Sequence, residues 1–116
     1  MFSKLDYIML HVNNMEKSAN FYHHILGFPV KFKSDGWSEL DTGTTTIALH
    51  FTKETVSPSK FMSFGFIVDN IQESFNKLVV SGAKLNRNIE EEGDGILMAS
   101  FQDPDGHVFW IAQQKK

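Results

Sequence analysis

The sequence contains one internal repeat, and this repeat restricts the fold more than any other feature. Residues 12–20 read VNNMEKSAN and residues 68–76 read VDNIQESFN, so Val, Asn, Ser and Asn are identical at a constant offset of 56. Three further pairs are conservative replacements, namely Asn with Asp, Met with Ile and Glu with Gln. Self-similarity of this kind indicates that one supersecondary unit occurs twice.

The flanks of both copies predict the same order of a strand and a helix. Residues 5–12 and 61–68 are rich in apolar, aromatic and branched side chains, which is typical of strands. Apolar residues then recur at helical spacing in each copy. Each helix is expected to end just before a glycine, Gly27 or Gly82, because glycine suits a left-handed C-terminal cap.

The starts of the two helices are predicted from polar pairs three residues apart. Asn13 with Glu16, and Asp69 with Gln72, have the spacing of a capping box. We therefore expect Asn13 and Asp69 to cap the two helices.

Extended runs separated by turn residues follow each predicted helix. These runs are residues 29–33, 37–41 and 45–52 in the first half, and 84–88, 96–102 and 107–113 in the second. The acidic run Glu90–Glu92 is expected in a loop. The order β-α-β-β-β thus occurs twice, in a repeat at about 5–52, a link at about 53–60 and a repeat at about 61–113. A unit of about 50 residues is too small to bury a stable hydrophobic core by itself. We therefore predict that both repeats form a single domain over residues 1–116.

Composition excludes several classes of function. The chain has 11 Lys and Arg against 14 Asp and Glu, so no nucleic acid is expected as a partner. It has no cysteine, which excludes disulfides, thiolate metal sites and a cysteine nucleophile. No apolar stretch approaches the roughly 20 residues that cross a bilayer, and no targeting signal is recognised. We expect a cytoplasmic protein without a membrane partner.

Phenylalanine is the one unusual component, with 11 residues in 116. Most of them fall on predicted helices and strands. Side chains alternate between the two faces of a strand, so Phe64, Phe66 and Phe109 are predicted to face the helices and build the core. Phe61 has the opposite parity and is expected on the other face of its strand.

The duplicated unit and two local motifs resemble a known superfamily. The turn Asp103-Pro104-Asp105-Gly106 opens the last strand, and the first helix carries Ser18, Phe21-Tyr22 and Leu26-Gly27-Phe28. Over residues 5–113 the chain resembles the vicinal oxygen chelate superfamily, which includes glyoxalase I, bleomycin-resistance proteins and extradiol dioxygenases. The resemblance implies an α+β fold in which the two βαβββ repeats form curved mixed sheets around a cup. It also implies a homodimer, because a second subunit completes the cup in many short members.

The resemblance further implies four metal-ligand positions in the cup, at Tyr7, Ala48, Ser63 and Trp110. Ala48 and Trp110 cannot bind a metal, and Tyr7 and Ser63 are poor ligands beside His or carboxylate. We therefore predict no metal cofactor, with a divalent metal at relocated ligands as the alternative. Glyoxalase I activity is not expected.

Strand alternation predicts which other side chains line the cup. Met9, His11 and His50 share parity with the four ligand positions, which makes them candidate ligand-binding residues beside Tyr7, Ala48, Ser63 and Trp110. His11 and His50 have three interpretations: an acid-base or ligand-orienting pair, a displaced metal site, or rim residues bonded to backbone or water.

The tryptophans also have open interpretations. Trp110 either forms a floor on which a flat or cationic ligand stacks, or fills the space that a metal would occupy. Trp37 either guards the mouth of the cup or packs against a sheet edge.

These observations give one leading hypothesis and two alternatives. The leading hypothesis is a metal-free protein that binds a small aromatic or amphipathic molecule in a cup at a dimer interface. The first alternative is a superfamily enzyme, a lyase, isomerase or dioxygenase with relocated metal ligands or with acid-base chemistry by His11, His50 or Tyr7. The second is a structural or partner-binding dimer whose cup is filled.

Overall fold

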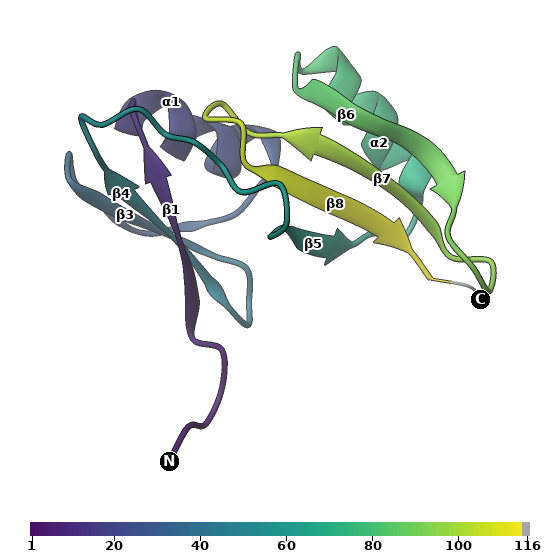
Figure 1. Cartoon of the computed structure of the whole chain (residues 1–116), viewed down its shortest axis with the longest axis horizontal. Coiled ribbons are helices and arrows are strands. Elements are labelled where there is room, and N and C mark those ends of the chain that lie inside the picture. The colour runs from purple at the N-terminus through teal and green to yellow at the C-terminus, as the bar shows by residue number, and fades with distance from the viewer. Residues whose placement is uncertain (115–116) are drawn as a thin grey trace. The chain divides into compact units, whose positions relative to one another are not determined.

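The chain divides into two compact units, each built on a four-stranded sheet (Figure 1). The computed structural model describes residues 1–114. The first unit covers Met1–Ser57 and the second begins at Pro58. Among the described residues, no helix is long and apolar enough to cross a membrane.

The first unit contains a mixed sheet and one short helical segment. Its elements are β1 (Tyr7–Val12), α1 (Met15–Asn20), the π-helical turn η1 (Phe21–Ile25), β2 (Val30–Lys33), β3 (Trp37–Asp41) and β4 (Thr46–Phe51). The strand order is β1-β4-β3-β2. β1 is parallel to β4, and the other neighbours are antiparallel.

The second unit repeats this arrangement. Its elements are β5 (Phe64–Ile67), α2 (Ile71–Val80), β6 (Lys84–Glu91), β7 (Leu97–Gln102) and β8 (Val108–Gln113). The strand order is β5-β8-β7-β6, with β5 parallel to β8. The predicted α+β class and the duplicated β-α-β-β-β order are therefore confirmed.

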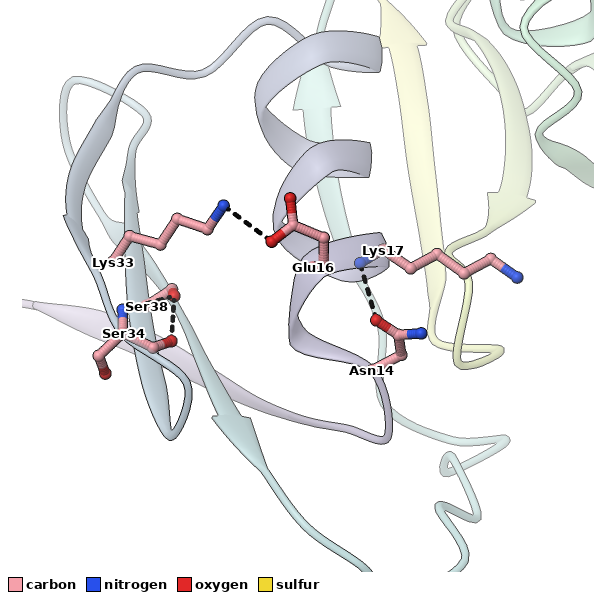
Figure 2. Close-up of polar contacts among 6 residues, drawn as sticks. All are labelled: Asn14, Glu16, Lys17, Lys33, Ser34 and Ser38. Carbon is pink, nitrogen blue, oxygen red and sulfur yellow. Dashed lines mark hydrogen bonds and ion pairs between the residues drawn. The ribbon is translucent and has the colours of Figure 1, made fainter.

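Both helices are capped one residue later than the sequence pattern indicated. The side chains of Asn14 and Asn70 accept hydrogen bonds from the backbone N–H three residues further on, at 3.0 Å and 3.1 Å (Figure 2 shows the first). The prediction of Asn13 and Asp69 as caps was wrong. Asn13 instead donates to two backbone carbonyls of the segment after β4, at 3.0 Å and 2.7 Å, and so fastens that segment to the end of β1.

Glu16 also has a different partner from the one that a capping box requires. Its carboxylate pairs with the Lys33 ammonium at 3.2 Å, which links α1 to β2 (Figure 2). Both side chains are well exposed, so the pair contributes only about 0–1 kcal/mol. In the turn from β2 to β3, the buried Ser38 hydroxyl donates to the carbonyl of Ser34 at 3.3 Å.

The first helix is shorter than its apolar spacing predicts. α1 ends at Asn20, and the chain continues as the π-helical turn η1, closed by a hydrogen bond from the Leu26 N–H to the Phe21 carbonyl at 3.0 Å. Gly27 and Gly82 follow the helical segments with φ of 86° each, as expected for left-handed caps.

Two strand boundaries in the second unit differ from the prediction. β5 begins at Phe64, so Phe61 lies outside the strand and is 95% exposed, contrary to its predicted position on the sheet. β6 continues to Glu91, so Glu90 and Glu91 belong to a strand and not to a loop. Glu90 and Glu91 are extended because they pair with Met98 and Leu97 of β7. The local sequence is polar and does not indicate this pairing.

Phenylalanine rings form the core of the second unit. Phe109 is fully buried, and its ring lies 6.3 Å from Phe64, 6.0 Å from Phe66 and 6.2 Å from Phe101 between centroids. Phe75 of α2 reaches the Phe101 ring at 5.3 Å. The predicted helix-facing parity of Phe64, Phe66 and Phe109 is confirmed.

Replacing Phe109 by alanine should destabilise the protein strongly. Phe-to-Ala changes in a packed core cost about 3–5 kcal/mol, because transfer energy and packing contacts are both lost. Urea unfolding followed by circular dichroism measures this loss. The control is Phe61→Ala, which removes the same side chain from an exposed position and should change the free energy of unfolding by less than about 0.5 kcal/mol. Equal losses in the two variants would contradict the assignment of the core.

Candidate functional site

The candidate site is one face of the first sheet, assembled from three adjacent strands. α1 packs against β3 and β4, and the side chains of β1 alternate between half-buried or buried and exposed. The strand register aligns the opposite face in three rows. We call this the first open face; its rows are Tyr7–Thr46–Asp41, Met9–Ala48–Glu39 and His11–His50–Trp37.

One row brings three ring side chains together. The centroids of the His11 and His50 rings are 5.3 Å apart, and those of His50 and Trp37 are 5.7 Å apart. His11 and His50 are exposed, whereas Trp37 is half-buried. The two histidines that the sequence singled out are thus direct neighbours on the sheet.

Tyr7 and Trp37 meet across the middle strand. Their ring centroids are 6.4 Å apart and their planes are inclined by 74°. Ala48 lies between them on β4 and is only 1% exposed. Because residue 48 has only a methyl group, a side chain from β3 can lean across β4 toward β1. We call Tyr7, His11, Trp37 and His50 the ring cluster.

A carboxylate accompanies the ring cluster. The Trp37 indole N–H donates to the Glu39 carboxylate at 2.8 Å, and both side chains belong to β3. From the sequence, Trp37 had two open interpretations and Glu39 was not a candidate. Their period-two spacing was visible, but the strand order that places β3 beside β4 was needed to connect them with the histidines.

The predicted residues of the second unit contact each other. The Trp110 indole N–H donates to the Ser63 hydroxyl at 3.1 Å. Ser63 precedes β5 and is not part of a strand, contrary to the prediction of a strand over 61–68. Gly65 lies opposite Trp110, and a Cβ there would approach the Trp110 Cβ at 3.4 Å, so the two strands pack closely at this pair.

The four family ligand positions do not fit a divalent metal. Ala48 has no atom that could bind a metal, and the Trp110 indole nitrogen carries a proton and donates a hydrogen bond to the Ser63 hydroxyl. A metal needs lone pairs, which His and carboxylate side chains supply best. Among residues 1–114, no group of three or more His, Cys, Asp or Glu side chains is arranged to hold a metal ion.

Comparison with known proteins places this geometry in context. The family model described as "Glyoxalase/Bleomycin resistance protein/Dioxygenase superfamily" matches residues 4–111. A lactoylglutathione lyase of Neisseria meningitidis serogroup A is 26% identical over 127 residues, covering 97% of this chain and 91% of that protein. The glutathione transferase FosA of Serratia marcescens is 25% identical over 113 residues, covering 92% of this chain and 78% of that protein.

Solved structures show the same fold. A glyoxalase-related enzyme from Fulvimarina pelagi superimposes with a TM-score of 0.84 at 22% identity, covering 97% of this chain and 89% of that one. An integron cassette protein from the mobile metagenome of the Halifax Harbour sewage outfall superimposes with a TM-score of 0.80 at 25% identity. The match covers 97% of this chain and 100% of that one.

The bond between Ser63 and Trp110 should be measurable as a coupling free energy. In a double-mutant cycle with Ser63→Ala and Trp110→Phe, we expect a coupling of about 0.5–1.5 kcal/mol, the usual net value of a hydrogen bond. The free energies come from urea unfolding of the four proteins. As a control, Ser34→Ala combined with Trp110→Phe should be additive, because the Ser34 hydroxyl donates to the Trp37 carbonyl at 2.7 Å and not to Trp110. A coupling of zero for Ser63 would contradict the bond.

Proposed function

The chain belongs to the glyoxalase/bleomycin resistance protein/dioxygenase superfamily, and from this premise we propose that it is a metal-free small-molecule-binding member. Its ligand is a small aromatic or amphipathic molecule that lies on the first open face. The observation that carries the proposal is the ring cluster, in which contacting rings from three strands share one exposed sheet face.

The chemistry of the first open face supports such a ligand. Tyr7 is 52% exposed and Met9 is 43% exposed, so large apolar groups face solvent beside polar rings. Adjacent exposed apolar side chains rimmed by polar groups are typical of ligand or partner surfaces. Stacking of a flat molecule on an aromatic side chain contributes about 0.5–1.5 kcal/mol beyond the area it buries.

The proposal includes a homodimer. The family resemblance implies that a second copy of the chain completes the ligand cup, and the exposed apolar side chains of the first open face support a covered surface in the working protein. The proposal also includes the absence of a metal cofactor, because the residues at the family ligand positions lack suitable donor atoms.

An enzyme of the same superfamily is the second candidate. It is favoured by the contact between His11 and His50, which places two groups capable of acid-base chemistry beside Tyr7 and Trp37 on one face. The two named relatives are a lyase and a transferase. In this alternative the same face binds the substrate and the histidines move protons.

Ligand binding should raise the thermal midpoint of the protein. A compound that binds only the native state stabilises it in proportion to the logarithm of its concentration over Kd. We expect hits among small aromatic and amphipathic compounds in a thermal-shift screen, with affinity reduced about tenfold in Trp37→Ala as measured by calorimetry. Phe61→Ala should bind with unchanged affinity. A screen without any hit would favour a structural or partner-binding dimer and would overturn the proposal.

Metal analysis tests the other part of the proposal. Protein purified without a chelator or a histidine tag should contain far less than one transition-metal ion per chain by mass spectrometry. The metal content of the His11→Ala and His50→Ala variants should equal that of the unmodified protein. Stoichiometric zinc, nickel, iron or manganese that disappears in these two variants would contradict the proposal and support the enzyme with relocated ligands.

A further inference from the structure

We infer that the ligand of the first open face carries a positive charge and is an organic cation, such as a quaternary ammonium or an N-alkylated aromatic ring. The inference rests on the proposed function, since it names the chemical class of that ligand. It assigns the binding of the charge to Trp37, Tyr7 and Glu39.

Two aromatic rings lie side by side on the first open face. Tyr7 and Trp37 form an edge-to-face pair with ring centroids 6.4 Å apart and planes inclined by 74°. The face of an aromatic ring carries negative electrostatic potential, and it attracts cations within about 6 Å, most strongly on tryptophan. A ring face that remains accessible on this pair therefore favours a cation over a neutral molecule of the same shape.

A carboxylate lies beside these rings. The Glu39 carboxylate accepts a hydrogen bond from the Trp37 indole N–H at 2.8 Å. This bond holds the carboxylate next to the ring and increases the electron density of the indole. One hydrogen bond leaves several lone pairs of the carboxylate available to a ligand. The side chain of Glu39 is already half-buried.

The charged groups of the first open face differ in their partners. At the row of Tyr7, the Asp41 carboxylate accepts a hydrogen bond from the Gly43 N–H at 2.7 Å, and the Lys31 ammonium donates to the neighbouring Thr46 hydroxyl at 2.9 Å. In the described part of the chain, no ion pair joins Glu39 to a lysine or arginine. His11 and His50 occupy the remaining row.

A ligand that covers Glu39 therefore has to compensate its charge. Removing an ionised carboxylate from water is unfavourable unless an opposite charge accompanies it. A neutral or anionic molecule would leave Glu39 uncompensated under its surface. A cation would satisfy the carboxylate and the aromatic faces at the same time.

Three probes of similar size and different charge test the inference. They are N-methylquinolinium as the cation, quinoline as the neutral molecule and naphthoate as the anion, titrated into the full chain by calorimetry at neutral pH. We expect the cation to bind about tenfold more tightly than quinoline, and naphthoate to bind most weakly.

Two isosteric variants locate the charge preference. Glu39→Gln keeps an oxygen that accepts the indole N–H and removes the charge, so the ratio of the quinoline and N-methylquinolinium Kd values should fall toward one. Asp41→Asn makes the same charge change one row away and should largely keep the ratio. Both substitutions preserve side-chain size, and thermal midpoints verify that the variants are folded.

The outcomes separate this inference from the proposed function. If quinoline binds as tightly as N-methylquinolinium, or if Glu39→Gln keeps the full ratio, the inference is overturned while small-molecule binding stands. If no aromatic probe of any charge binds, the proposed function fails together with the inference. If Asp41→Asn lowers the ratio of the two Kd values as much as Glu39→Gln does, the assignment of the charge preference to Glu39 is also overturned.

Discussion

The parallel pairing of β1 with β4 is the constraint on which the rest of the first unit depends. Parallel strands cannot be joined by a tight turn, so the chain must leave the sheet as a helical segment and return before β4 can pair. The return path builds β2 and β3 on the far side of β4. In this way the first, third and fourth strands of the unit place their side chains in common rows, although up to 39 residues separate the partners in sequence, as for His11 and His50.

The fold was largely predictable, because the repeat and the strand-helix periodicity are local signals. β3 has the predicted bounds, Trp37–Asp41, since polar turn residues flank it on both sides. The errors arose where a distant partner decided the outcome. Asn13 binds the segment after β4 instead of capping the helix, and Glu90 and Glu91 are extended because β7 pairs with them.

The candidate site was only half predictable, for the same reason. Parity along single strands correctly placed Tyr7, Met9, His11 and His50 on one face. Glu39 was missed because nothing local shows that β3 is a direct neighbour of β4. The second unit repeats the topology with different chemistry, since Trp110 and Ser63 are joined by a hydrogen bond at positions where the family resemblance implies metal ligands. The two units therefore share a strand order and differ in the side chains on these faces.

The small size of Ala48 restricts which side chains the centre of this face can hold. A methyl group at this position removes a side chain from the centre of β4 and opens the space in which Trp37 and Tyr7 approach each other. A longer side chain with a metal-donor atom at residue 48 would occupy the same space as the two rings. The aromatic contact and a metal donor at this position are therefore sterically alternative.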